Sequence, residues 1–139
     1  MPATIAANAS AVYATLAKEA FLRGRDDRQL LLLSTLVAGD SVLAENVTYF
    51  RTPKEMLLQK PEITMEVLKK GRGYEIALRT NTLARDVYLS ADGVPGFFSD
   101  NFFDLVPGTT KRIMFTCDKE VLDLRSKLKT LNVFDATEN

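Results

Sequence analysis

The side chains that could do chemistry in this chain are carboxylates, lysines, tyrosines and serines. Its 139 residues include no histidine and one cysteine, Cys117. Without histidine the chain lacks the most frequent general base and metal ligand, and every Ser-His or Cys-His nucleophile pair is excluded. A single thiol can form neither an internal disulfide nor a structural zinc site. The sequence therefore predicts no metal site and no cofactor.

Paired carboxylates are the remaining route to catalysis, because a glycosidase uses two of them, roughly 5–10 Å apart, across one sugar bond. The candidates are Glu62 with Glu66, Asp100 with Asp104, and the group Asp118, Glu120 and Asp123. Each set also fits a non-catalytic position, on the outward face of a strand, in a turn or in a charged surface loop. We predict that none is catalytic.

A charged run, Arg23–Arg28, could serve as a phosphate or carboxylate site, but it carries both charge signs. Salt-bridged surface is the favoured interpretation. Over the whole chain, 18 basic and 18 acidic residues give zero net charge, with a pI of about 6.3. Nucleic-acid binders usually show a basic excess or stripe, so we predict no nucleic-acid partner. No apolar run approaches the roughly 20 residues that span a bilayer, which argues against a membrane partner.

The stretch around which the rest of the chain is organised is Phe97–Gly108, which holds four of the eight phenylalanines. Its pattern is that of a core and places no catalytic group. Asp100-Asn101 predicts a turn, because these short side chains hydrogen-bond nearby backbone. A strand with Phe103 and Leu105 on one face follows, then a type II turn at Pro107-Gly108 and a return strand, Lys111–Thr116, completing a hairpin. The two phenylalanine doublets are predicted to be core and not a sugar-stacking platform, since phenylalanine offers no polar tip.

Short strand patterns follow one another along the chain, separated by Gly, Pro and Asn. A hairpin is predicted from Leu30–Val37 with Ser41–Phe50, and half-buried strands from Ile63–Lys69 and Arg85–Ser90. One helical turn is predicted at 18–22, and residues 121–134 fit a strand or a short helix. This pattern predicts an all-β fold, an antiparallel β-sandwich.

Two prolines, Pro53 and Pro61, bracket the best boundary in the chain, because proline resists a central strand. The sequence therefore predicts three regions: 1–52 as the last strands of a preceding domain, 53–61 as a docked linker, and 62–139 as a complete sandwich domain.

Three runs, Tyr74–Leu78, Leu83–Leu89 and Phe98–Gly108, resemble the C-terminal immunoglobulin-like domain of β-mannosidases of glycoside hydrolase family 2. Upstream, Val42–Phe50 and Pro53–Glu55 resemble the end of the preceding immunoglobulin-like domain and its linker. The most specific motif also resembles related exo-acting enzymes such as exo-chitosanases. Its residues are Phe98, Ser99, Asp100, Asn101, Phe102, Phe103, Asp104, Leu105, Pro107 and Gly108.

The resemblance implies an immunoglobulin-like sandwich preceded by a partial second one, with a non-catalytic structural role beside the catalytic barrel of a larger exo-acting β-mannosidase. The family's catalytic glutamates lie in that barrel, and no residue here matches them. The implied partners are the barrel, the neighbouring immunoglobulin-like domains and mannose-containing glycans. A bacterial parent would be periplasmic or secreted.

Two alternatives remain open: an independent carbohydrate-binding module, and an adhesion-type sandwich that binds protein. A truncated first domain also predicts exposed apolar surface in the first fifty or so residues, which would draw the chain into dimers or pair with the complete domain. By the favoured interpretation, the chain alone hydrolyses no glycoside and binds mannosides weakly or not at all.

Overall fold

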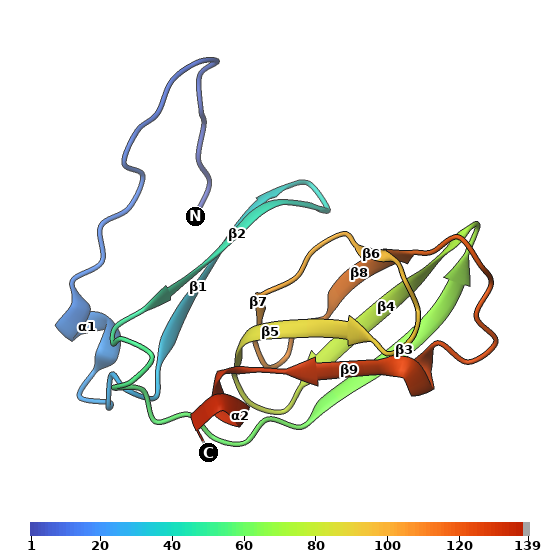
Figure 1. The fold of residues 1–139 in the computed structure, drawn as a ribbon. Coiled ribbons are helices and arrows are strands. Elements are labelled where there is room, and N and C mark those ends of the chain that lie inside the picture. Colours follow the sequence, from blue (N-terminus) through green and yellow to red (C-terminus); the bar gives the residue numbers. More distant parts are fainter. Residues whose placement is uncertain (138–139) are drawn as a thin grey trace. The chain divides into compact units, whose positions relative to one another are not determined.

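The chain divides between Leu57 and Leu58 into two compact units in the computed structural model, which describes residues 1–137 (Figure 1). Each unit is taken by itself below. In the part of the chain that the structure describes, no helix is both long and apolar enough to cross a membrane.

The first unit contains one short helix and one hairpin. Helix α1 (Lys18–Leu22) ends where Arg23 and Gly24 take positive φ of 49° and 75°, as the glycine signal predicts. Strand β1 (Leu31–Ala38) pairs antiparallel with β2 (Ser41–Tyr49), which confirms the predicted hairpin. The segments 4–8 and 11–16 join no sheet within residues 1–137.

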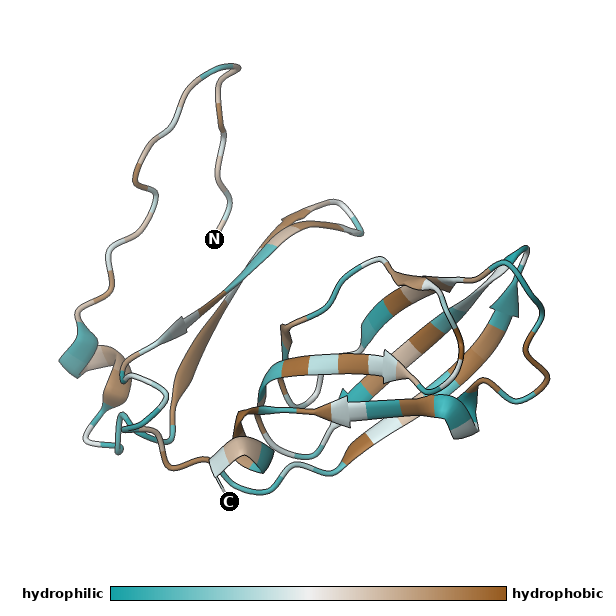
Figure 2. Cartoon of the chain, in the orientation of Figure 1, coloured by the Kyte–Doolittle hydropathy of each residue, from teal (hydrophilic) through white to brown (hydrophobic). Residues whose placement is uncertain are grey.

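Every residue of this first unit keeps part of its surface exposed. The hairpin is nevertheless apolar, as the brown stretches along both strands in Figure 2 show. Leu36 and Val37 on β1 and Val42 and Leu43 on β2 are exposed. This confirms the predicted exposed apolar surface. A two-stranded sheet has no second layer, so it can cover neither of its faces.

The second unit packs two antiparallel sheets face to face (Figure 1). One sheet has the order β3-β4-β8-β6, formed by Ile63–Lys70, Gly73–Thr80, Lys111–Thr116 and Phe97–Phe98. The other has the order β7-β5-β9, formed by Phe103–Leu105, Ala84–Ala91 and Leu128–Leu131. A 3₁₀ turn, η1 (Arg125–Lys127), precedes β9, and helix α2 (Val133–Thr137) follows it. The segment 121–134 therefore contains both a strand and helical turns.

Inward-facing residues of both sheets form one core. Alternation along β5 illustrates the rule, since Val87 and Leu89 are buried while Asp86 and Tyr88 face outward. Phe103 and Leu105 lie in the same cluster as residues of the opposite sheet, as predicted. The buried cluster comprises Tyr74, Ile76, Leu78, Ala84, Val87, Leu89, Phe103, Leu105, Ile113, Phe115, Leu124 and Leu128. The predicted all-β antiparallel sandwich is confirmed.

One prediction about this unit is wrong. Strands β7 and β8 were expected to form a hairpin, but β7 pairs with β5 in one sheet while β8 pairs with β4 and β6 in the other. The segment 106–110 carries the chain from one layer to the other. Strand alternation correctly predicted which face of each strand is apolar. Alternation carries no information about which strand is the hydrogen-bonding neighbour. The prediction failed because it assumed that two consecutive strands pair with each other.

Candidate functional site

The polar side chains of the Phe98–Gly108 motif bind the backbone of other strands. The Ser99 hydroxyl accepts from the Met114 N–H at 2.9 Å, and the Ser99 N–H donates to the Met114 carbonyl at 2.8 Å. The Asn101 amide accepts from the Leu89 N–H at 2.7 Å and donates to the Leu89 carbonyl at 3.0 Å. Ser99 thus binds one sheet and Asn101 the other, so the motif joins the two layers.

The two carboxylates of the motif have similar positioning roles. Asp100 forms an ion pair with Lys111 at 2.7 Å. Asp104 accepts from the Asp86 N–H at 2.9 Å, next to an irregularity in the β5–β7 register. Lys111 also lies over the Phe103 ring, 5.2 Å from its centroid. Each acid is thus engaged in a contact that holds the motif in place.

The turn that ends the motif is as predicted. Gly108 has φ of 81°, and the Thr109 N–H donates to the Val106 carbonyl at 3.2 Å, closing the four-residue turn around Pro107-Gly108. Nothing lies within 4 Å of where a Gly108 Cβ would be, so this glycine is required for its backbone conformation alone.

The two phenylalanine doublets are not wholly core, which corrects the prediction. Phe103 is 7% exposed and Phe98 packs against Phe115 with ring centroids 4.6 Å apart. Phe97 and Phe102 are 81% and 67% exposed. In β6 consecutive residues face opposite ways, so Phe97 points outward while Phe98 packs inward. Phe102 instead lies before β7, at a positive φ of 58°.

The remaining carboxylate candidates also lie on the second unit. Glu66 forms an ion pair with Arg79 at 3.0 Å, and Asp123 accepts from the Ser126 N–H at 3.2 Å. Glu62 is exposed at the start of β3. These groups are engaged by cations or turns, or stand on an outer face, as the structural interpretation predicted.

Asp118 and Glu120 do line a shared cavity of about 440 Å³, but with cations around them. Lys69, Arg72 and Lys119 line the same cavity, and Lys69 is ion-paired with Glu120. The hydrogen bond to Glu120 raises the pKa of Lys69. Glu120 is therefore held by a cation at this cavity.

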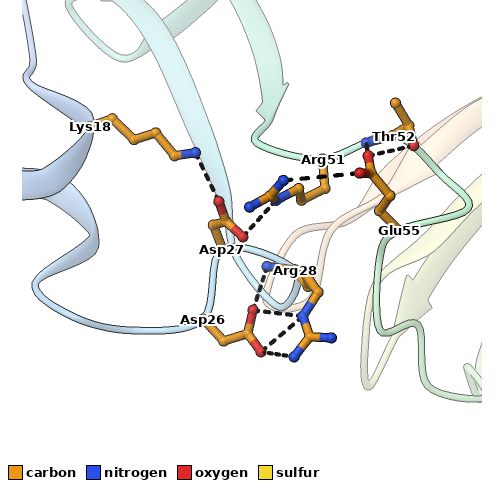
Figure 3. A network of polar contacts seen from close by, with 7 residues as sticks. All are labelled: Lys18, Asp26, Asp27, Arg28, Arg51, Thr52 and Glu55. Carbon is orange, nitrogen blue, oxygen red and sulfur yellow. Dashed lines mark hydrogen bonds and ion pairs between the residues drawn. The ribbon is translucent and has the colours of Figure 1, made fainter.

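The charged run of the first unit folds into a network of ion pairs (Figure 3). Asp27 binds Arg51 Nε and Lys18 Nζ, each at 2.8 Å. The hydrogen bond from Arg51, and next that from Lys18, lower the pKa of Asp27 to about 2. Asp27 is thereby a fixed anion whose charge is compensated by two cations.

Neighbouring residues complete this network (Figure 3). Arg28 holds Asp26 in a two-pronged contact, with its Nη2 at 2.7 Å, and this bonding lowers the pKa of Asp26. Glu55 accepts from both the hydroxyl and the N–H of Thr52, at 2.7 and 3.1 Å, as in a capping box. Arg28 and Arg51 are already bonded to acids, so residues 26–28 of the run are salt-bridged surface.

In residues 1–137, no group of three or more Cys, Asp or Glu side chains is arranged to hold a metal ion. The geometry found is that of structural ties and surface charge pairs. What sequence reasoning missed is the bonding of Asn101 to the backbone of a strand twelve residues earlier, because a turn signal such as Asp-Asn indicates only local partners.

Two known domain families match successive parts of this chain. Residues 58–136 match the Ig_mannosidase family, described as an Ig-fold domain. The chain belongs to this family. Residues 1–55 match a second family, the mannosidase Ig/CBM-like domain. The resemblance drawn from the Phe98–Gly108 motif, to immunoglobulin-like domains of mannosidases, is thereby confirmed.

A solved structure with the same fold is the β-D-mannosidase from Dictyoglomus thermophilum. It has 21% sequence identity and a TM-score of 0.65, over 73% of this chain and 13% of that chain. The present chain thus spans a small part of the length of that protein. The comparison with curated proteins gave no match.

Proposed function

We propose that this chain is a non-catalytic accessory region of a larger exo-acting β-mannosidase of glycoside hydrolase family 2, and that it packs against the catalytic barrel. In this proposal residues 62–139 are a C-terminal immunoglobulin-like domain, residues 1–52 are the end of the domain before it, and residues 53–61 link them. The chain itself performs no hydrolysis.

The observation that carries the proposal is the succession of two mannosidase domain families along one short chain. The neighbouring structure with the same fold is itself many times longer. The chemistry of the described residues supports the non-catalytic part of the proposal, because its candidate carboxylates are ion-paired, capping or isolated on outer faces.

An activity assay on three proteins tests the proposal. The pure chain should release no product from an aryl β-mannoside, whereas the full-length parent polypeptide should release it. The parent lacking residues 58–139 should melt at lower temperature, because a packed face of its barrel would be uncovered. Turnover by the pure chain, or a parent that is inactive on β-mannosides, would overturn the proposal.

A further inference from the structure

The cavity of about 440 Å³ that Asp118 and Glu120 line is built from two segments far apart in the sequence. Residues 69–74 contribute the turn between β3 and β4, where Gly71 has a positive φ of 58°. Residues 117–120 follow the end of β8. Most of the lining residues are charged, and we call this site the Arg72–Lys119 cavity.

The two segments that line the Arg72–Lys119 cavity are fixed by hydrogen bonds. The hydroxyl of the buried Tyr74 donates to the Val121 carbonyl at 3.0 Å and accepts from the Val121 N–H at 2.8 Å. Within the second segment, the Cys117 thiol donates to the Lys119 carbonyl at 3.1 Å. The backbone of the cavity is therefore held in place by the domain itself, which reduces the entropy that a ligand loses on binding.

Cations outnumber acids at the cavity. The cations are Lys69, Arg72 and Lys119, and the acids are Asp118 and Glu120. Lys69 is ion-paired with Glu120. Among the residues that the structure describes, no hydrogen bond or ion pair engages the side chains of Arg72, Lys119 or Asp118. Two cations and one acid are thus left without a charged partner, a surplus of one positive charge.

The ion pair between Lys69 and Glu120 can be exchanged for a pair with a ligand. Both side chains are exposed, at 51% and 65%, and exposed ion pairs contribute little free energy. An anion that enters the cavity can therefore replace the Glu120 carboxylate on Lys69 at small cost. The site then presents three cations.

We propose that the Arg72–Lys119 cavity binds an oxyanion, in the form of a phosphate, sulfate or carboxylate group. The Arg72 guanidinium donates parallel N–H bonds to two oxygens of the anion, the geometry for which arginine is suited. Lys119 supplies a second positive charge, and Lys69 a third once Glu120 is displaced. The volume of the cavity lies in the range of small-molecule sites, so the anion can be the charged group of a larger molecule.

The surrounding charges favour one anionic group over a metal ion or a polyanion. A metal ion is disfavoured because the charge surplus at the cavity is positive. A nucleic acid would follow a stripe of free cations. Here Lys70, next to Lys69, is paired with Glu75 at 2.7 Å, and Arg125 donates to the Met65 carbonyl at 3.2 Å. These neighbouring cations are already engaged.

The test is a titration of the intact ¹⁵N-labelled chain with sodium phosphate, sodium sulfate and sodium acetate, followed by amide chemical shifts. Sodium chloride keeps the ionic strength constant and low, because salt screens such contacts. Saturable shifts should concentrate at residues 71–73 and 117–120, with Kd on the order of 1 mM. Tighter binding of phosphate and sulfate would assign the site to tetrahedral dianions, and equal binding of acetate would assign it to any oxyanion.

Three substitutions of exposed residues test the roles assigned to the side chains. Arg72→Gln should weaken phosphate binding by about tenfold, since it removes the two-pronged donor. Lys119→Gln should weaken binding by about threefold. Glu120→Gln should strengthen it by about threefold, because the carboxylate that competes for Lys69 is removed. This opposite sign separates a ligand site from a structural ion pair.

Lys127→Gln is the matched control, because Lys127 is an exposed lysine in η1 that does not line the cavity. It should leave the titration unchanged. The oxyanion site would be overturned if no anion gave saturable shifts, if shifts lay elsewhere, or if Lys127→Gln and Arg72→Gln had equal effects. Weaker binding by Glu120→Gln would also contradict it. Equal shifts with sodium chloride alone would reduce the effect to general screening and remove the site.

Discussion

The strands of both units are rich in apolar residues, but those residues are buried in the second unit and exposed in the first. In the second unit, alternating strands of two sheets face each other and bury residues such as Phe115 and Leu78 completely. In the first, β1 is a nearly continuous apolar run, a pattern typical of strands covered on both faces, yet it is exposed. Strand sequence therefore determines strand formation, whereas burial requires a second layer that the first unit does not contain.

The units also differ in what stabilises them. The second has one contiguous core and interlayer ties from Ser99 and Asn101. The first depends on a hairpin and on the Asp27 network, and exposed ion pairs contribute little free energy each. We expect the two units to unfold independently, the first at lower denaturant concentration, and the following changes test that difference.

The largest expected effect is that of Phe103→Ala. Removing a ring buried between the sheets should lower the free energy of unfolding of the second unit by about 3–5 kcal/mol, because a cavity remains. Urea unfolding followed by amide signals of each unit would measure this. Signals of the first unit should keep their midpoint, and Phe97→Ala should leave both unchanged. A midpoint for Phe103→Ala equal to that of the unsubstituted chain would show that Phe103 is not core.

Asn101→Ala should have the next largest effect. It leaves the N–H and carbonyl of Leu89 without their partner in a partly buried position, at a cost of about 1–3 kcal/mol. Hydrogen exchange at the Leu89 amide should accelerate more than exchange elsewhere on β5. Unchanged protection of that amide would mean that the Asn101 bonds do not join the layers.

Gly108→Val should destabilise the second unit by about 1 kcal/mol or more, through backbone strain alone. The matched comparison is Gly96→Ala, because a Cβ at Gly96 would lie 2.4 Å from the Phe115 ring. There the cost is a collision with the core, expected at about 1–3 kcal/mol. A Gly108→Asn variant should recover stability relative to valine, since Asn tolerates positive φ; equal stability of the two would contradict the strain argument.

The smallest effect concerns pH and the first unit. The pKa of Asp27 is about 2 in the folded chain, below the value of about 3.9 expected when unfolded. Its contribution to stability is therefore complete above pH 4 and is lost as pH falls through 2. NMR titration of the Asp27 carboxyl would measure this pKa, and Asp27→Asn should flatten the acid dependence of the first unit's midpoint. A carboxyl titrating near 4 would contradict the network.

Much of the second unit could be predicted because its signals are local. Alternation placed Val87, Leu89 and Phe103 inward, and Pro107-Gly108 specified its turn. The neighbours of β7 and β8 could not be predicted, since these strands are consecutive along the chain but belong to different sheets. The positive φ of Asp86 and Phe102 has no signature in the sequence, since neither residue is a glycine.

The uncharged strand β1 affects the behaviour of the chain while it is being synthesised. Residues Leu31–Ala38 carry no charge, proline or glycine, the features that protect a free strand edge. Synthesis proceeds from the N-terminus at about 5–20 residues per second, so this hairpin leaves the ribosome several seconds before β9. During that interval it can template cross-β pairing with nascent neighbours. Yield of this chain when it is made by itself should therefore depend on translation rate and on chaperone supply.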